Sequence, residues 1–287
     1  RLISSIFVLY RRFFHTIFHS SFITRFLVFS IILFFPSNVR ASWETRELPH
    51  FFIHYQAIDN RVTQALAAQA DSIYQTITED VGYTPQKKTF VYLCPTPECF
   101  RQKQPTNVKL PEWAVGVAYP SFSRIVMRSA LTAEEKGYTR GSIKPVEIFK
   151  HEFAHIVLEQ ALEKRGGAPR WLSEGFSMYH AKQWMLSGQR TIEEVTLRND
   201  FIPLIMLTAA FPSDEETARI AYAQSFSLVS FMLKTYGRPV FNRFIKNLRE
   251  GMDTNAALFY STGRNLTQLE REWQTYLKKR HTWFAYL

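Results

Sequence analysis

The sequence predicts an α+β fold in which a small lobe, built on a mixed sheet, is followed by a mainly helical lobe. Three observations support this prediction. Short segments rich in aromatic and β-branched residues are confined to the part of the chain before residue 131. From residue 131 onward, apolar residues recur at helical spacing instead. The composition, 46% hydrophobic over 287 residues, is typical of a chain with a buried core and excludes a disordered or fibrous protein.

The first lobe is expected to occupy residues 42–135. Its predicted strands are HFFIHYQA (50–57), KTFVYLC (88–94) and a pair, WAVGVAYP and SRIVMRSA, that is joined near Ser121. Its predicted helices are 61–83, which has apolar residues at helical spacing, and a short segment at 97–104.

The helical lobe is expected at 136–287, so that 42–287 forms one catalytic domain. Its first helix should begin at Pro145, which suits a first turn, and stop at Gly166 and Gly167. The segment PRWLSEGFSMYHAKQWML then predicts a second helix that opens near Ser173. Further helices are predicted at 217–237, 239–250 and 266–281, separated by Gly237 and Gly263.

Residues 1–41 have the pattern of an export segment. They hold five arginines and no acidic residue, and the apolar run FLVFSIILFFP (26–36) is followed by Val39 and Ala41, which suit a signal-peptidase site. We therefore expect a periplasmic or secreted protein whose mature chain starts near Ser42. The alternative is an uncleaved membrane anchor at 26–36, although this run is shorter than the roughly 20 apolar residues of a spanning helix.

The net charge does not predict a nucleic-acid partner. The formal charge is +10, but without residues 1–41 the chain has 30 basic and 25 acidic residues, a net charge of +5. The excess is spread along the chain without a block of Lys and Arg. This distribution is typical of a solvated surface and not of a phosphate-binding face.

The only two cysteines, Cys94 and Cys99, stand in the segment CPTPEC. In an exported protein, this spacing favours a short disulfide loop over two free thiols. A zinc site at these thiols is not expected, because no second Cys or His pair lies close by in the sequence.

The segment HEFAH places His151 and His155 four residues apart within a predicted helix. Both imidazoles should therefore project from one face and can chelate one ion, and Glu152 can reach a water held by that ion. The alternative is a buried helix whose histidines only form hydrogen bonds.

The segment WLSEG places Glu174 near the start of the following helix. A hairpin that turns at Gly166 and Gly167 would bring Glu174 back against His151 and His155. Two imidazoles, one carboxylate and a water are the ligands of a catalytic zinc site, so one Zn²⁺ per chain is expected. The alternative is a solvated glutamate at a helix start.

Together these motifs resemble the gluzincin zinc metallopeptidases, and more narrowly the bacterial peptidase MA-like domains, in which HExxH is followed by W-L-x-E-G. The resemblance covers roughly 90–240, with GVAYP (116–120) at the place of the substrate-binding edge strand. It implies a gluzincin-like fold with the active-site helix between the two lobes, and a cleft for an extended peptide. It also implies that Glu152 is the base and that Tyr222 donates to the developing oxyanion. The alternative for Tyr222 is a role in packing.

Two departures from the family pattern matter. The Gly-x-Met-Glu-Asn segment with which related aminopeptidases grip a free N-terminus is replaced by GVAYPSF, which favours an endopeptidase. Met178 stands where some relatives carry an Asp, so the partners that orient the histidines are not identified.

Other polar residues near the motifs have simpler expected roles. Glu159 is expected either to hydrogen-bond a ligand or to face solvent. Tyr179 and His180 are expected to be packing or surface residues.

The sequence thus predicts an exported zinc metallopeptidase that acts on peptides or proteins, with no nucleic-acid partner and with a membrane contact only through an uncleaved N-terminal segment. The alternative from another class is an exported, non-catalytic binding or assembly domain that keeps the peptidase fold. Cleavage specificity and oligomeric state are not predicted.

Overall fold

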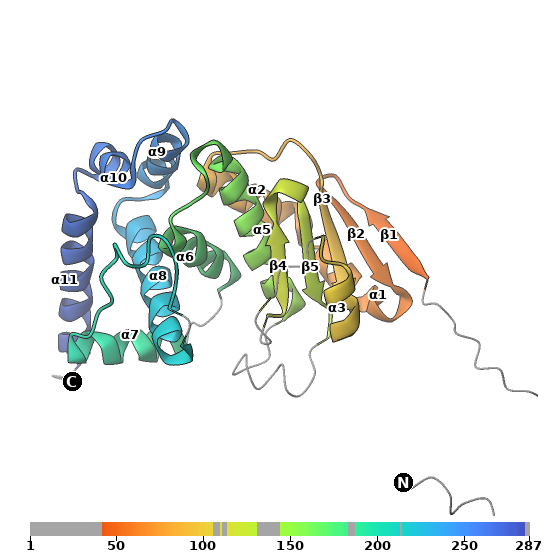
Figure 1. Cartoon of the computed structure of the whole chain (residues 1–287), viewed down its shortest axis with the longest axis horizontal. Coiled ribbons are helices and arrows are strands. Elements are labelled where there is room, and N and C mark those ends of the chain that lie inside the picture. Colours follow the sequence, from red (N-terminus) through yellow and green to blue (C-terminus); the bar gives the residue numbers. More distant parts are fainter. Residues whose placement is uncertain are drawn as a thin grey trace, which may run out of the picture. The chain divides into compact units, whose positions relative to one another are not determined.

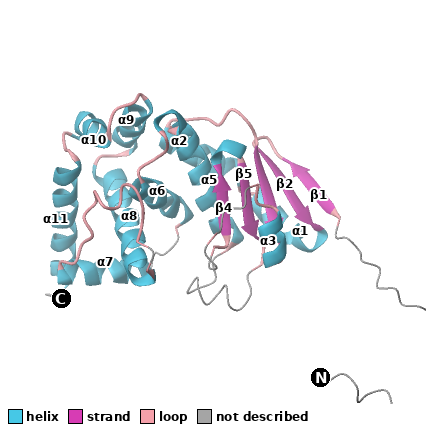
Figure 2. Ribbon diagram, in the orientation of Figure 1, coloured by secondary structure: helices cyan, strands magenta, loops and turns pink. Residues whose placement is uncertain are grey.

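The sheet of the first lobe has five strands in the order β1-β2-β3-β5-β4, with bounds β1 Trp43–Glu47, β2 Phe51–Gln56, β3 Thr89–Cys94, β4 Gly116–Tyr119 and β5 Arg124–Arg128 (Figures 1 and 2). The three central strands run parallel, whereas β1 and β4 are antiparallel edge strands. The sheet is therefore mixed, and the α+β prediction is confirmed.

The computed structural model describes residues 42–105, 110, 114–130, 144–182, 187–212 and 214–284. Residues 41–287 form one compact unit. The predicted signal peptide at 1–41 and the alternative anchor at 26–36 lie outside the described residues. Among the described helices, none has the length and apolarity needed to cross a bilayer.

One face of the sheet is covered by helices α1 (Asn60–Ala67), α2 (Ala70–Val81) and α5 (Pro145–Ala161) (Figure 1). Alternate strand residues point into this layer and are fully buried, among them Ile53, Val91 and Ile125. The single helix predicted at 61–83 is wrong, because the segment forms α1 and α2. The turn between Leu66 and Ile73 carries no large apolar side chain, so a bend there lets both helices reach the sheet.

The other face of the sheet carries the short helix α3 (Pro97–Gln102), which packs through Phe100. Thr96 caps α3, since its Oγ1 accepts a hydrogen bond from the backbone N–H of Cys99 at 3.2 Å. Cys94 and Cys99 form a disulfide, as predicted. The bond ties the start of α3 to the end of β3.

The remaining helices follow the turn at Gly166 and Gly167, whose φ values of +91° and +106° favour glycine. They are α6 Arg170–Ala181, α7 Ser187–Arg198, α8 Glu215–Thr235, α9 Arg238–Arg249, α10 Thr254–Thr262 and α11 Leu266–Phe284 (Figure 1). The predicted start of the second helix near Ser173 is wrong by one turn, since α6 opens directly after Pro169. Three elements were not predicted at all: β1, α7 and α10.

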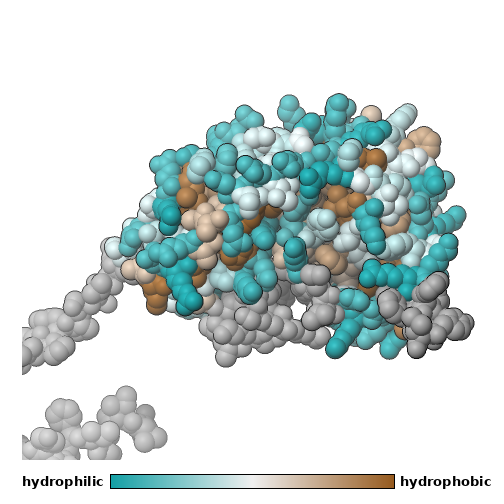
Figure 3. All heavy atoms as spheres, turned by 180° about the vertical axis from the view of Figure 1, so that it is seen from behind, coloured by the Kyte–Doolittle hydropathy of each residue, from teal (hydrophilic) through white to brown (hydrophobic). Residues whose placement is uncertain are grey.

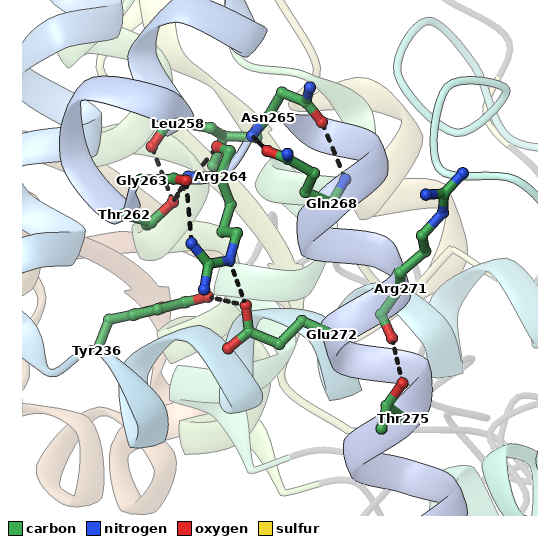
Figure 4. Close-up of polar contacts among 10 residues, drawn as sticks. All are labelled: Tyr236, Leu258, Thr262, Gly263, Arg264, Asn265, Gln268, Arg271, Glu272 and Thr275. Carbon is green, nitrogen blue, oxygen red and sulfur yellow. Dashed lines mark hydrogen bonds and ion pairs between the residues drawn. The ribbon is translucent and has the colours of Figure 1, made fainter.

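Polar side chains define the turn from α10 to α11 (Figure 4). Asn265 and Gln268 bond reciprocally, each side chain accepting from the other backbone N–H at 2.9 Å. Glu272 accepts from Tyr236 at 2.9 Å and from Arg264 at 3.0 Å, which ties α11 to the end of α8. On the face shown in Figure 3, hydrophilic side chains predominate and apolar ones are scattered among them.

Helix α6 packs between α5 and α8. It approaches α8 closely at Gly175, where an added Cβ would lie 2.3 Å from the Ser225 carbonyl oxygen and 2.8 Å from Val229 Cγ2. Only glycine allows the two backbones to come this close. Because Glu174 immediately precedes Gly175, this contact also fixes the position of the predicted glutamate ligand.

Candidate metal centre and active site

Helix α5 presents His151 and His155 on one face, as the spacing predicts. The helix starts at Pro145 and is capped by Glu147, whose carboxylate accepts from the Lys144 backbone N–H at 3.2 Å. The two imidazole Nε2 atoms lie 3.1 Å apart. The pair therefore offers two donors to one point in space.

Glu174 on α6 completes this group. Its Oε2 lies 3.7 Å from Nε2 of His151 and 3.7 Å from Nε2 of His155. These three residues form the one cluster of potential metal ligands found among the described residues, with ligand atoms within 4.8 Å of one another. Tetrahedral zinc with bonds of about 2.0–2.1 Å separates its donors by about 3.3 Å, so the three side chains fit this ion.

A hydrogen-bond chain fixes the orientation of His155. Ser173 Oγ donates to Glu159 Oε1 at 2.7 Å, and Glu159 Oε2 accepts from the Ala168 backbone N–H at 3.0 Å. Since the single hydroxyl proton of Ser173 is used in this way, the 3.0 Å contact between its Oγ and His155 Nδ1 requires that Nδ1 carry a proton. Nε2 of His155 then has a free lone pair directed at Glu174 and His151.

These hydrogen bonds decide between the two roles expected for Glu159. Its carboxylate is bonded to Ser173, the residue that orients the predicted ligand His155, and to the backbone of Ala168. Ser173 was not predicted from the sequence as a residue of the site. The available signal was a hydroxyl residue directly before the predicted glutamate ligand. For His151 the situation differs, because its buried Nδ1 has no hydrogen-bond partner within the described part of the chain.

Glu152 lies on the side of α5 that faces the edge strand β4. Burial raises the pKa of the Glu152 carboxyl, while the two neighbouring histidines and a backbone hydrogen bond from Ala118 act in the opposite direction. A Cβ added to Gly116 on β4 would lie 2.6 Å from Glu152 Oε1. Glycine at this position therefore lets the strand pass directly against the carboxylate.

Comparison with known proteins agrees with this geometry. A family model described as the Peptidase MA superfamily matches residues 67–279. The chain belongs to the Peptidase MA superfamily. The resemblance stated from HExxH and W-L-x-E-G is thereby confirmed, and membership supports a hydrolase that acts on peptide bonds.

Among solved structures, this Peptidase MA superfamily member is similar to a mutant of the M1 zinc metallopeptidase from Deinococcus radiodurans, with 17% identity and a TM-score of 0.48 over 80% of this chain and 52% of that one. It is also similar to native LTA4 hydrolase from yeast, with 14% identity and a TM-score of 0.45 over 83% of this chain and 38% of that one. The chain thus spans about half or less of the length of these structures. A search of curated proteins found no match.

Electrostatics in this Peptidase MA superfamily site favour a cation between the donors. For Glu174, burial opposes ionisation, but His155, His151 and Arg170 outweigh it and hold the pKa well below its usual range. For His155, burial lowers the pKa, but the charge of Glu174 and that of Glu152 raise it overall. Two buried carboxylates thus create a negative potential at the imidazole nitrogens.

Tyr222 on α8 reaches the same cluster. Burial raises the pKa of its hydroxyl, with a further contribution from Glu174, and Arg170 is within hydrogen-bonding reach. Its ring packs edge-on against Phe211, with centroids 4.9 Å apart. The structure therefore places the Tyr222 hydroxyl within electrostatic range of the predicted ligand Glu174.

Tyr179 and His180, by contrast, do not belong to this cluster. His180 is buried, with its Nε2 3.2 Å from Asp80 Oδ2 on α2, and Tyr179 is partly exposed. Both side chains serve in packing or at the surface.

Proposed function

We propose that this chain is a zinc-dependent peptidase in which His151, His155 and Glu174 hold one zinc ion and Glu152 is the general base. The observation that carries the proposal is the convergence of the three donors, with Nε2 of His155 freed for a metal by the bond at Nδ1. A site that places a buried carboxylate directly beside such donors has the groups of metal-assisted hydrolysis.

When bound, zinc would supply Lewis acidity and lower the pKa of water toward neutrality. Glu152 takes the proton of the attacking water and returns it to the leaving amine. The raised pKa of Glu152 suits both transfers, because burial makes the carboxylate a better proton acceptor than one in water. Tyr222 donates its hydroxyl proton in a hydrogen bond to the carbonyl oxygen as negative charge develops there.

The substrate we propose is an extended peptide that adds to the edge of the sheet at β4. This strand pairs with β5 on one side, and its Gly116 contacts Glu152. Backbone pairing along such an edge would present a scissile bond to the base and bind peptides irrespective of their side chains. The sequence GVAYPSF in place of a segment that grips a free N-terminus supports an endopeptidase.

The decisive experiment compares zinc content and cleavage of an unfolded protein in matched variants. Glu152→Gln keeps the size of the side chain and removes its basicity, so zinc should stay near one per chain while cleavage falls by about 10²- to 10⁴-fold. His155→Ala and Glu174→Ala should lose zinc and activity together. Glu147→Gln, on the same helix, alters only an N-terminal capping contact and is the control.

Four outcomes would contradict parts of the proposal. Wild-type cleavage by the Glu152→Gln variant would exclude this base. Wild-type zinc affinity in the Glu174→Ala variant would exclude this ligand. If peptides with a blocked N-terminus were not cleaved while free ones were, the endopeptidase assignment would be replaced by aminopeptidase activity. Zinc binding without any cleavage would instead favour a non-catalytic binding domain.

We also propose that the protein is exported. The support is the basic and apolar pattern of residues 1–41 together with the disulfide between Cys94 and Cys99, a bond that persists in oxidising compartments. Mass spectrometry of protein recovered outside the cytoplasm should give a chain that starts near Ser42. An intact N-terminus on protein confined to the cytoplasm would contradict the proposal.

A further inference from the structure

Arg170 is the first residue of α6 and lies one helical turn before Glu174, on the same side of the helix. Its Nη2 is 2.7 Å from Glu174 Oε1. The other oxygen of that carboxylate, Oε2, is the one that faces His151 and His155. Each oxygen of Glu174 therefore has its own partner, and Arg170 determines which one is available to a metal.

The same guanidinium has a second partner on α8, the hydroxyl of Tyr222. Phe211 lies beside both side chains, since its ring centroid is 5.9 Å from Arg170 Cζ and 4.9 Å from the ring of Tyr222. The backbone of Arg170 is held as well, because its N–H donates to the Thr208 carbonyl at 2.8 Å. Arg170 thus links the predicted glutamate ligand on one helix to the predicted oxyanion donor on the next.

This pair differs from an ordinary ion pair on a helix. Lys246 on α9 and Glu250 at its C-cap have the same spacing, but their Nζ and Oε1 are 3.7 Å apart and both side chains are more than half exposed. Such pairs contribute little because water and salt screen them. The side chain of Glu174 is only 5% exposed, so its charge is hardly screened and the direction of the guanidinium has a strong effect.

We propose that Arg170 is a positioning residue that holds the Glu174 carboxylate and the Tyr222 hydroxyl in one arrangement, and so couples metal binding to stabilisation of the oxyanion. This inference rests on the proposed function. The planar guanidinium can bond both partners at once, which an ammonium group does poorly. Because the Tyr222 oxygen accepts from Arg170, the hydroxyl proton is directed away from the guanidinium.

The first test measures zinc affinity by competition with a chelator. Arg170→Met should raise the dissociation constant for zinc by about 10- to 100-fold, the usual effect of removing a group that orients a ligand. Arg170→Lys keeps the charge and should lie between that variant and wild type. Arg101→Met removes an exposed arginine that pairs with Glu98 at 2.9 Å on α3, and should leave zinc affinity and cleavage unchanged.

The second test is a double-mutant cycle on kcat/KM at saturating zinc. If Arg170 acts through Tyr222, the loss caused by Arg170→Met should be several-fold smaller in the Tyr222→Phe background than in wild type. If the double variant instead lost kcat/KM by the product of the two single losses, the coupling between Arg170 and Tyr222 would be overturned. Wild-type zinc affinity in both Arg170 variants would overturn the contact with the ligand.

These outcomes can be told apart from failure of the proposed function. Wild-type protein that binds zinc but cleaves nothing would refute the peptidase, while the chelator competition would still decide whether Arg170 positions Glu174. If the Arg170→Met variant does not fold, as judged by thermal unfolding, Arg170→Lys carries both measurements.

Discussion

Replacing Gly175 with alanine tests whether the close contact of α6 and α8 holds the site together. The added Cβ would lie 2.3 Å from the Ser225 carbonyl oxygen, whereas ordinary contacts begin at 3.4 Å, so the two helices must separate by about 1 Å. No side-chain rotation can relieve this contact, because the new Cβ is fixed to the backbone of α6 and meets the backbone of Ser225 on α8. Overpacking of this kind costs about 3 kcal/mol at the upper end of its usual range, and alanine regains about 1 kcal/mol of helix propensity. We expect a net loss of about 2 kcal/mol.

The same substitution should affect the site more than the stability. Glu174 is adjacent to Gly175, and Tyr222 lies one turn before Ser225 on α8. A separation of about 1 Å between these helices therefore moves a metal ligand away from the oxyanion donor. Misplacement by about this distance costs roughly 10²-fold in rate.

Urea denaturation and kcat/KM, measured on the same preparations, check both parts of this prediction. Ser177→Ala is the matched control, because it places alanine on the same helix, adds no atom and removes a buried hydroxyl that has no partner within the described residues. That variant should be as stable and active as wild type. If Gly175→Ala also matched wild type in stability and rate, the close approach of the helices would have no role in the site.

Three further predictions concern other contacts. Ser173→Ala removes the hydrogen bond that orients His155, so the dissociation constant for zinc should rise by about 10-fold in a chelator competition. An unchanged dissociation constant would show that this hydrogen bond does not matter for zinc binding. Gly116→Ala should keep zinc but reduce cleavage and lower stability, because the new Cβ would lie 2.6 Å from Glu152 Oε1 and 2.7 Å from Cγ2 of the buried Ile148. Full activity would show that the contact with Glu152 is unimportant. Burial raises the pKa of Asp59, so ionising this carboxyl is less favourable in the folded than in the unfolded chain. The folded state therefore loses stability as pH rises from the ordinary Asp pKa of about 3.9 through the raised pKa of Asp59. Asp59→Asn should remove this loss and be at least as stable as wild type at pH 7 by urea denaturation, and a marked destabilisation there would contradict the reasoning.

Local pattern was sufficient to place an element wherever a segment carried both its period and a boundary signal. The start of helix α5 was predicted because Pro145 marks it. The predicted end at Gly166 and Gly167 is wrong by about a turn, since α5 ends at Ala161 and a 3₁₀ turn at Glu163–Arg165 leads to the glycines. Strand β1 was missed since WETRE has no apolar alternation, which reflects an edge strand with one pairing side. Helix α7 was missed because its sequence, SGQRTIEEVTLR, is mostly polar and buries few apolar side chains.

The candidate site divides in the same way. His151, Glu152 and His155 follow from spacing within one helix, and Glu174 follows from a hairpin that the glycines mark. Ser173 and Arg170 required the three-dimensional packing, because their roles depend on which faces of α6 meet α5 and α8. The sequence pattern predicts that α6 is a helix. It does not predict how α6 is rotated about its axis, and that rotation decides which residues face α5 and α8.

The segment W-L-x-E-G consequently mixes two kinds of requirement. Trp171 and Leu172 are fully buried. At position 175 only glycine, which has no Cβ, lets α6 approach α8 this closely. These three positions would be needed by any protein with this helix pair, whether or not it binds metal. A relative that had lost its enzymatic activity would therefore still carry most of the signature, and only the glutamate within it distinguishes a working hydrolase from an inherited scaffold.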